Sequence, residues 1–350
     1  MTLVPFPAQP SDTPWPAQDW PRGDLPATAD AAKLTALLDT ALAPQAIGPI
    51  GETHAFIAVQ RGRIVAERYL GGAYTAEATY PSWSMAKSIT QLLIGFLAAE
   101  GRIDVNAPLN APEWDGADDP RAKLTWTQLL HMSSGLEFRE DYVDGAVSDT
   151  IEMLFASGKD DMGAYAANKP VAHWPDTVFN YASGTSNILA RALGQLVGGG
   201  EAGMRDFMAD RLFGPLGIND PIPKFDGIGT FIGSSYCFMR AEDFARIGLF
   251  ALRGGIWDGT RLLPESWIDY ARTPGPAQPE DGRGYGAHWW LNSFSKDGFS
   301  MNGYAGQWVA CCPHRDLIIV RHGNSVNEPS SMLRQEAAHQ WVKDAMACFG

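Results

Sequence analysis

The sequence lacks the features that mark membrane-spanning, secreted and nucleic-acid-binding proteins. Its longest apolar stretch, residues 89–99, is interrupted by Thr90 and Gln91 and is too short to cross a bilayer. The N-terminus shows no basic segment followed by an apolar one, as a secretory signal would. Lys and Arg number 27 against 40 Asp and Glu, a net charge of -13, which disfavours binding to nucleic-acid phosphates or anionic lipids. We therefore expect a cytoplasmic protein with no nucleic-acid or membrane partner.

Cysteine is scarce, and the signal of the α/β-hydrolase fold is missing. The chain has four cysteines with no framework spacing: Cys237, Cys311, Cys312 and Cys348. Buried, reduced thiols are the expected state, and a cysteine nucleophile or a metal site is the alternative. The motif GxSxG, which places the serine of an α/β-hydrolase on a sharp turn, occurs nowhere. A Ser-His-Asp triad is therefore not indicated, although seven histidines are present.

Length and composition suit one large globular domain or two closely joined ones: 350 residues, 45% hydrophobic and 19% charged. Residues 1–28, rich in Pro and Trp, predict an extended arm lying on the body. Residues 29–103 and 221–350 are expected to form an α/β domain built on an antiparallel sheet. Residues 104–220 are expected to form a helical domain, with the active site between the two.

Local patterns predict the elements within these domains. Asp30 is expected to cap a helix that runs to about Ala43, and residues 54–69 predict a β-hairpin. A strong helical pattern begins at Ser84 and stops at Gly101. The region 104–220 reads as mostly helical, and strand-like runs return after it. The clearest later segments are strands at 285–294, 306–313 and 316–323 and a final helix at 332–347.

Two SxxK matches are candidates for a serine nucleophile with a lysine beside it: residues 84–87 and residues 293–296. Ser84 stands where a helix begins, so Ser84 and Lys87 share one face, and the helix dipole favours negative charge near Ser84. A lysine among apolar neighbours loses part of its preference for the charged form and can act as a base. Ser293 has no helix after it and is the expected decoy. The alternative for Ser84 is a simple helix cap with a solvated Lys87.

Two further motifs supply the other groups that acyl transfer needs. Tyr181-Ala182-Ser183 precedes a predicted helix and offers a second proton-handling group; the alternative is a core tyrosine. Tyr80 also fits Tyr-x-Ser but lies too close to Ser84 in the sequence to reach over it. Residues 303–308 offer a strand edge with small residues, whose amide could face a substrate; a tight turn is the alternative.

Together these elements resemble the serine β-lactamase and penicillin-binding-protein superfamily, in the order SMAK, YAS and a Lys-Thr-Gly-like strand at 304–306. Four other stretches resemble it: LTWTQLLHMSSGL (124–136), RLFGPLGI (211–218), RAEDFARIGLFALRGGIWDG (240–259) and YGAHWW (285–290). The resemblance runs from about residue 55 to the C-terminus. It implies an α+β fold, in which an antiparallel sheet is flanked by N- and C-terminal helices and carries an inserted, mostly helical domain.

The resemblance implies a role for each matching residue. Ser84 would attack a carbonyl, while Lys87 and Tyr181 would share the base and acid roles in an order left open. The backbone amides of Ser84 and Gln307 would form the oxyanion hole. Ser183, at the place where β-lactamases usually have Asn, would orient Lys87 or the substrate. No metal or organic cofactor is implied.

One motif departs from the β-lactamase pattern. Tyr304-Ala305-Gly306 stands where those enzymes place Lys-Thr-Gly, whose ammonium and hydroxyl bind a substrate carboxylate. Arg321 or His322 on the neighbouring strand would have to replace that anchor. We therefore expect weak or absent β-lactamase activity, with Tyr304, Ala305 and Gly306 lining the substrate site.

The chain is more similar to 6-aminohexanoate-dimer hydrolases and β-lactamase-like carboxylesterases, which share the Tyr-x-Ser variant and a Gly-x-x-Gly-Gln strand. Their acidic-aromatic loop resembles residues 139–144 and makes Tyr142 a candidate for a substrate hydrogen bond; an exposed loop aromatic is the alternative. Those relatives often carry His where this chain has Ala305, so nylon-oligomer amidase activity is not predicted. Six tryptophans near the motifs are candidates for an apolar pocket wall: Trp83, Trp126, Trp174, Trp289, Trp290 and Trp308.

The leading hypothesis is a serine hydrolase that cleaves a small-molecule ester or amide through an acyl-enzyme on Ser84. No oligomeric state is indicated. One alternative is a transacylase that uses the same acyl-enzyme. The other is a catalytically silent binding module on the same fold.

Overall fold

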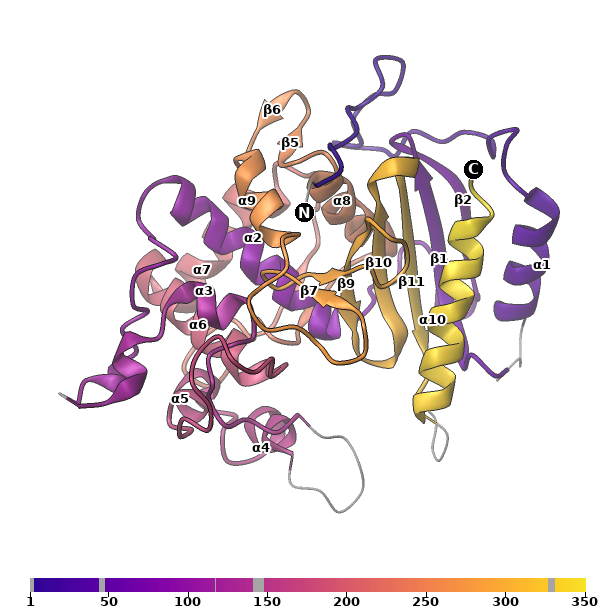
Figure 1. Ribbon diagram of the computed structural model, residues 1–350. Coiled ribbons are helices and arrows are strands. Elements are labelled where there is room, and N and C mark those ends of the chain that lie inside the picture. Colours follow the sequence, from indigo (N-terminus) through magenta and orange to yellow (C-terminus); the bar gives the residue numbers. More distant parts are fainter. Residues whose placement is uncertain (1–2, 44–47, 117, 141–147, 327–330) are drawn as a thin grey trace.

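A seven-stranded sheet forms the centre of the computed structural model, which describes residues 3–43, 48–116, 118–140, 148–326 and 331–350 (Figure 1). The strand order is β2-β1-β11-β10-β9-β8-β7, and each neighbouring pair is antiparallel. The strands are β1 (Glu52–Gln60), β2 (Arg63–Tyr69), β7 (Gly284–Tyr285), β8 (Trp290–Leu291), β9 (Phe299–Gly303), β10 (Gln307–Cys312) and β11 (Leu317–Asn324).

The central strands bury side chains on both faces. In β1, Ile57 and Val59 belong to one hydrophobic cluster, whereas Phe56 and Ala58 belong to a second cluster on the opposite face. Successive side chains of a strand point to opposite faces, so a strand covered on both sides needs a nearly continuous apolar sequence. The β1–β11 pairing, from Glu52↔Asn324 to Gln60↔Leu317, places a hairpin from near the N-terminus beside the last strand.

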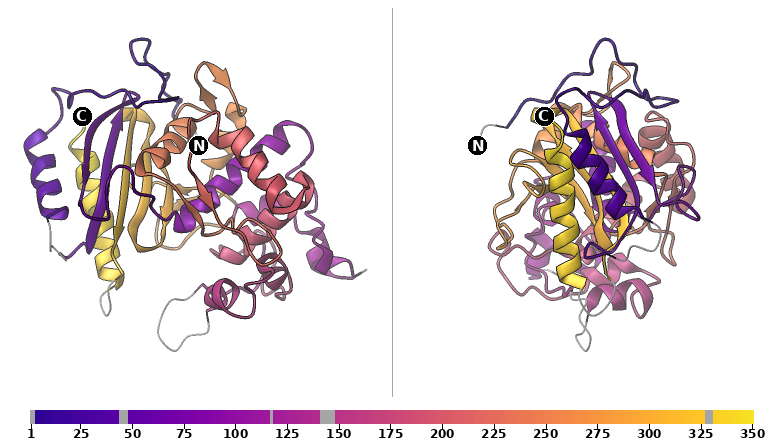
Figure 2. Two further views of the ribbon diagram at one scale, coloured as in Figure 1. Left: turned by 180° about the vertical axis from the view of Figure 1, so that it is seen from behind. Right: turned by 90° about the vertical axis from the view of Figure 1, so that its right-hand side faces the viewer.

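Helices cover both faces of this sheet (Figures 1 and 2). The N- and C-terminal helices, α1 (Ala31–Ala41) and α10 (Ser331–Ala347), lie on one face, as the family resemblance implied. On the other face, α8 (Ala241–Leu252) packs against β1, β10 and β11, with α2 (Ala86–Ala99) beyond it. Asp30 accepts a hydrogen bond from the Lys33 amide and so caps α1, as its sequence predicts. The α+β fold is thus confirmed.

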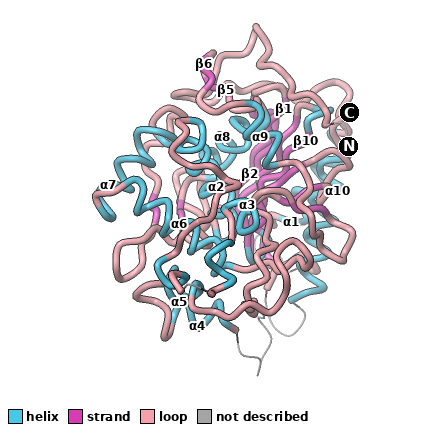
Figure 3. Tube along the Cα trace, turned by 60° about the vertical axis from the view of Figure 1, so that its left-hand side comes forward, coloured by secondary structure: helices cyan, strands magenta, loops and turns pink. Residues whose placement is uncertain are grey.

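Most of the remaining helices gather beyond α2, on the side of the molecule away from α1 and α10 (Figures 1 and 3). The longest of them, α6, packs against α2, α3, α5 and α7. The helices of this group are α3 (Trp126–Leu130), α4 (Asp149–Phe155), α5 (Met162–Ala167), α6 (Ser183–Val197) and α7 (Gly200–Met208). A π-helical turn, η4 (Ala209–Phe213), continues α7.

Short elements complete the fold. Two small hairpins are β3–β4 (Ile222–Pro223, Cys237–Phe238) and β5–β6 (Ile256–Trp257, Thr260–Arg261). The remaining helix is α9 (Glu265–Ala271), and the 3-10 turns are η1 (Trp83–Met85), η2 (Pro112–Trp114), η3 (Pro120–Lys123), η5 (Tyr304–Gly306) and η6 (Pro313–Arg315).

Two helices that the sequence patterns did not predict, α8 and α9, lie among the strands after residue 220. Neither helix begins with a side-chain cap of the kind that marks α1. The single strand expected at 285–294 is two short strands, β7 and β8, because the chain turns between them at His288, whose φ is 59°.

The N-terminal arm is fastened to the body by arginine side chains. Residues 3–28 contain no helix or strand, so their carbonyls need partners from elsewhere. Arg246 donates to Pro16 O at 3.0 Å and to Gln18 O at 2.7 Å, and Arg272 donates to Val4 O at 2.6 Å. The arm is therefore held by hydrogen bonds from buried guanidinium groups.

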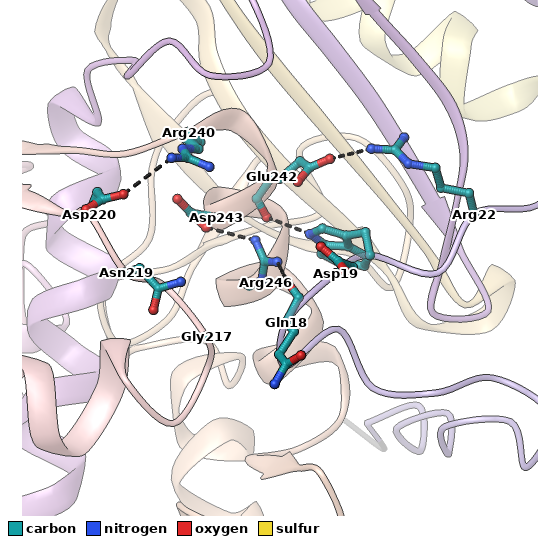
Figure 4. A pocket seen from close by; sticks show the side chains of 11 residues that line it. Gln18, Asp19, Arg22, Gly217, Asn219, Asp220, Arg240, Glu242, Asp243 and Arg246 are labelled. Atoms are coloured by element: carbon teal, nitrogen blue, oxygen red, sulfur yellow. Dashed lines mark hydrogen bonds and ion pairs between the residues drawn. The ribbon is translucent and has the colours of Figure 1, made fainter.

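A polar cavity of about 370 Å³ lies where the arm crosses the start of α8 (Figure 4). Its basic groups are paired with its acidic ones: Arg246 with Asp243 at 2.8 Å, and Arg22 with Glu242 at 2.8 Å. None of the site residues predicted from the sequence lines it. We therefore interpret this cavity as part of the charged interface between the N-terminal arm and the rest of the protein.

All four cysteines are buried and unbridged, and burial raises the pKa of the Cys237 and Cys311 thiols well above the ordinary value. Buried thiols of this kind make poor nucleophiles. In the described part of the chain, no group of His, Cys, Asp and Glu is arranged to hold a metal ion. No helix among the described residues combines the length and apolarity needed to span a membrane.

We expect Arg246→Ala to lower the free energy of unfolding by about 3–5 kcal/mol, because the change leaves Asp243 buried without its partner and two arm carbonyls unbonded. Urea denaturation measures the loss. Arg139→Ala is the control: it removes an exposed ion pair with Glu137 and should cost no more than about 1 kcal/mol. Equal, small losses in both variants would contradict this account of the arm.

Candidate active site

Ser84 lies in the 3-10 turn η1, immediately before α2. The segment leading to it is fixed: Tyr80 and Met239 exchange backbone hydrogen bonds at 2.7 and 3.2 Å, and the Ser82 hydroxyl donates to Ser235 O at 3.1 Å. Trp83 has a φ of 43°, a left-handed conformation that costs a non-glycine residue about 1–3 kcal/mol. The surrounding contacts thus hold Ser84 on a strained turn, two residues before α2 begins at Ala86.

Lys87 is buried one turn further along and its amine contacts three oxygens. Nζ lies 3.0 Å from Ser84 Oγ, 3.0 Å from Ser183 Oγ and 3.0 Å from Ser234 O. The side chain is 1% exposed, and burial lowers the pKa of Lys87 to about 8. The alternative of a solvated Lys87 beside a helix cap is therefore wrong.

Tyr181 completes the contact around Ser84. Tyr181 lies beside Ser84 and Trp290, and its ring lies 4.8 Å from Lys87 Nζ. Burial raises the pKa of Tyr181 far above its usual range, and the negative charge of Glu140 adds to this effect. The phenol therefore stays protonated and can donate to Ser84 or to a bound substrate.

Ser183 and Glu140 form the next layer behind Lys87. Ser183 Oγ donates to Glu140 Oε1 at 2.9 Å, and the Ser183 amide donates to Glu140 Oε2. Ser234, whose carbonyl accepts from Lys87, is itself held by its amide, which donates to Asn187 Oδ1 at 3.2 Å. The sequence motifs indicated a role at the site for Ser183 but not for Glu140 or Ser234. Glu140 lies in the acidic-aromatic loop that was singled out, but the residue chosen there, Tyr142, lies outside the described residues.

The turn between β9 and β10 approaches Ser84 from the sheet. A side chain at Gly303 would collide with the Ser82 carbonyl oxygen, so only glycine allows this approach. Tyr304-Ala305-Gly306 forms the turn η5, in which Ala305 has a φ of 63°, and Gln307 then begins β10. The Gln307 side chain bonds to Gly323 inside the sheet, at 2.6 Å from Nε2 to the carbonyl oxygen. Any contact of Gln307 with a substrate would therefore come from its backbone amide.

Two predicted substitutes for a carboxylate anchor are not available to a substrate. Arg321 is fully buried and donates to Gly306 O at 2.7 Å and to Thr53 Oγ1 at 3.1 Å. His322 is also fully buried, and its Nδ1 lies 3.2 Å from Gln307 Oε1. These side chains support the η5 turn from inside the protein, so the idea that either replaces the missing lysine is wrong.

Two of the six tryptophans proposed as a pocket wall lie beside the predicted site residues. Trp83 packs against Tyr304, with ring centroids 5.6 Å apart, and Trp290 packs against Tyr181 at 5.3 Å. The other four lie elsewhere: Trp126, Trp289 and Trp308 are buried in the core, and Trp174 is 81% exposed. Aromatic rings therefore lie next to Ser84, at Trp83, and next to Tyr181, at Trp290.

The second SxxK match is a decoy, as expected. Ser293 follows β8 in a loop and is 1% exposed, whereas Lys296 is exposed to solvent. Of the predicted set, the structure brings together Ser84, Lys87, Tyr181 and Ser183, with the η5 turn beside them.

Comparisons with known proteins show the family and the fold. A family model described as Beta-lactamase matches residues 52–340. The chain is 24% identical over 304 residues to the 6-aminohexanoate-dimer hydrolase of Paenarthrobacter ureafaciens, covering 77% of this chain and 72% of that protein.

Solved structures share the fold. One from Bacillus anthracis, named for the same dimer hydrolase activity, superposes with a TM-score of 0.72 at 22% identity and covers 92% of this chain and 87% of its own. A family VIII carboxylesterase superposes with a TM-score of 0.63 at 16% identity, over 91% of this chain and 99% of its own. With its sheet, its helices and most of its length matched in this way, the chain belongs to the beta-lactamase family.

Proposed function

We propose that the protein is a serine hydrolase that cleaves a carboxylic ester or amide through a covalent acyl-enzyme on Ser84. The observation that carries the proposal is the buried Lys87 amine, 3.0 Å from Ser84 Oγ, with a pKa lowered to about 8. A serine hydroxyl is a weak nucleophile and needs an adjacent base. A lysine becomes such a base when burial removes much of its preference for the charged form.

In the acylation step, Ser84 Oγ forms a bond to the substrate carbonyl carbon while its proton passes to Lys87. The backbone amides of Ser84 and Gln307 stabilise the oxyanion. The bond to the leaving alcohol or amine then breaks, and that group takes a proton from the Tyr181 hydroxyl. Tyr181 regains its proton from the Lys87 ammonium, so both residues return to their starting states.

In the deacylation step, a water molecule gives a proton to neutral Lys87 and attacks the acyl carbon. The bond from that carbon to Ser84 Oγ breaks, and Ser84 takes that proton from the Lys87 ammonium. The carboxylic acid product then leaves. This assignment makes Lys87 the base and Tyr181 the acid. The raised pKa of Tyr181 supports this assignment, since a tyrosine that stays protonated has a proton to give and cannot act as a base.

The substrate class is an ester or amide whose acyl group carries no carboxylate. Arg321 is occupied inside the protein, and the η5 turn offers Tyr304 and Ala305 where the β-lactamase motif has Lys and Thr. Trp83 and Trp290 supply apolar surface next to Ser84 and next to Tyr181. The names of the relatives, an amide hydrolase and a carboxylesterase, are consistent with both bond types.

Ser84→Ala should abolish turnover of p-nitrophenyl butyrate, because loss of the nucleophile of a serine hydrolase costs on the order of a million-fold in kcat. Ser293→Ala, in the decoy motif, is the matched control and should keep wild-type kcat. Release of p-nitrophenol measures both. Equal activity of the wild type and Ser84→Ala would exclude Ser84 as the nucleophile.

The rate should rise with pH until Lys87 is neutral. Below its pKa of about 8 the amine is protonated and cannot accept the serine proton, so kcat/KM should fall about tenfold for each pH unit. Above that value it should level off, because Tyr181 keeps its proton throughout the accessible range. A profile of kcat/KM from pH 6 to 10 tests this, and a rate independent of pH between 6 and 8 would contradict it.

Two esters of equal length test the missing anchor. Mono-p-nitrophenyl succinate carries a carboxylate where p-nitrophenyl butyrate carries a methyl group. Arg321 is buried and Arg283 is paired with Asp281, so the carboxylate would lose hydration without gaining a cation from the described residues. We therefore expect its kcat/KM to be at least about tenfold lower, which corresponds to a barrier higher by about 1.4 kcal/mol. A preference for the succinate ester would reveal an anchor other than Arg321.

A further inference from the structure

Glu140 holds Ser183 with both carboxylate oxygens. Oε1 accepts the Ser183 hydroxyl at 2.9 Å, and Oε2 accepts the Ser183 amide at the start of α6. Ser183 is 1% exposed, so water does not compete for its hydroxyl. An ionised carboxylate can only accept hydrogen bonds, which commits the single hydroxyl proton of Ser183 to Glu140.

This commitment decides which groups Lys87 can donate to. Ser183 Oγ, with its proton turned toward Glu140, faces Lys87 with lone pairs alone and can only accept. Ser234 O, a carbonyl oxygen, also accepts only. A neutral amine has two protons and one lone pair. Its two protons therefore go to Ser183 and Ser234, each 3.0 Å away, and its lone pair is left for the third neighbour, Ser84 Oγ at 3.0 Å.

We infer that Glu140 is a positioning residue, which, acting through the Ser183 hydroxyl, directs the lone pair of neutral Lys87 at the proton of Ser84. The inference rests on the proposed function, in which Lys87 is the base. Glu140 itself touches no reacting atom. If its carboxylate were absent, the Ser183 hydroxyl could rotate and donate its proton to Lys87, which would occupy the lone pair needed for Ser84.

Glu140 has a second, electrostatic effect on Lys87. Burial lowers the pKa of Lys87, and the negative charge of Glu140 offsets part of that shift by raising it. Among the described residues, Tyr181 keeps its proton, burial lowers the pKa of His288 to about 3, and the charge of Arg283 acts on Tyr181. The charge of Glu140 is therefore the charge next to Lys87 that a substitution can remove, and its loss should lower the pKa of Lys87.

The test compares Glu140→Gln with Glu137→Gln. Glutamine keeps the size of Glu140 but removes its charge and turns one acceptor into a donor. We expect kcat for p-nitrophenyl butyrate to fall about 10- to 100-fold, part of the 100- to 10,000-fold that general acid–base catalysis contributes. The acidic limb of the kcat/KM profile should also move to lower pH. Glu137→Gln removes the same charge from an exposed side chain three residues away and should change neither quantity.

A role confined to capping α6 predicts a different result. Glu140→Gln would then lower the melting temperature but leave both kcat and the acidic limb at their wild-type values, and this outcome would overturn the inference. Should Glu140→Gln be unfolded at the assay temperature, Ser183→Ala takes its place. This change keeps the hydrogen bond from the backbone amide of residue 183 to Glu140 and removes only the hydroxyl. An unchanged kcat would therefore also overturn the inference.

A double-mutant cycle separates the two effects of Glu140. Because the positioning effect passes through Ser183, Glu140→Gln should lower kcat little further in a Ser183→Ala background. The shift of the acidic limb acts through space and should persist there. Additive losses in kcat would show that Glu140 does not act through Ser183.

The proposed function can fail independently of this inference. If Ser84→Ala retains wild-type turnover, the nucleophile is wrong and the role of Glu140 falls with it. If turnover depends on Ser84 but Glu140→Gln leaves kcat and the pH profile unchanged, only the inference fails.

Discussion

A lysine amine already carries its proton in water at neutral pH, and burial is what leaves it neutral and able to act as a base. In this protein that constraint is met inside the first turn of α2, where Lys87 is almost fully buried yet surrounded by oxygen atoms. Burial without those oxygens would leave the amine unbonded, and oxygens without burial would leave it charged. The positions of Ser84, Ser183 and Ser234 around Nζ follow from this requirement.

The scaffold keeps those positions rigid by joining distant parts of the chain. Ser84 is on the turn before α2, Ser183 begins α6, and Ser234 lies in the loop before β4. The η5 turn arrives from the sheet and reaches Ser84 only because Gly303 has no side chain. Arg321 then holds that turn from beneath, through its bond to the Gly306 carbonyl. A core arginine in this position serves the shape of the site rather than the recognition of a substrate.

The sequence alone predicts the parts of the site that are encoded locally. Ser84 and Lys87 are one helical turn apart, and Tyr181 and Ser183 share one short motif, so spacing was enough to pair them. Glu140 and Ser234 could not be found in this way, since each meets Lys87 or Ser183 through a contact between segments distant in sequence. The outcome for Arg321 and His322 depended on their burial inside the sheet, on the central strand β11, which a strand pattern does not reveal.

The fold shows the same division. The β1–β2 hairpin and the terminal helices follow from alternation, caps and periodicity, and they were predicted with small errors in their bounds. Helix α8 was missed although its sequence has a polar side, since it begins without the capping side chain that marks α1. The tryptophans were misplaced for a different reason: a large aromatic side chain looks the same in sequence whether it fills the core or lines a pocket.

The pairing of β1 with β11 has a consequence for the synthesis of the protein. Ser84 and Lys87 precede β10 and β11 in the chain by more than 200 residues, so the ribosome makes them before the strands that pair across the centre of the sheet. Until β11 pairs with β1, the chain lacks the central core of the sheet, and in water the amine of a lysine carries its charge. The nascent chain therefore holds its serine without a working base, and the site becomes reactive only after β10 and β11 have joined β1.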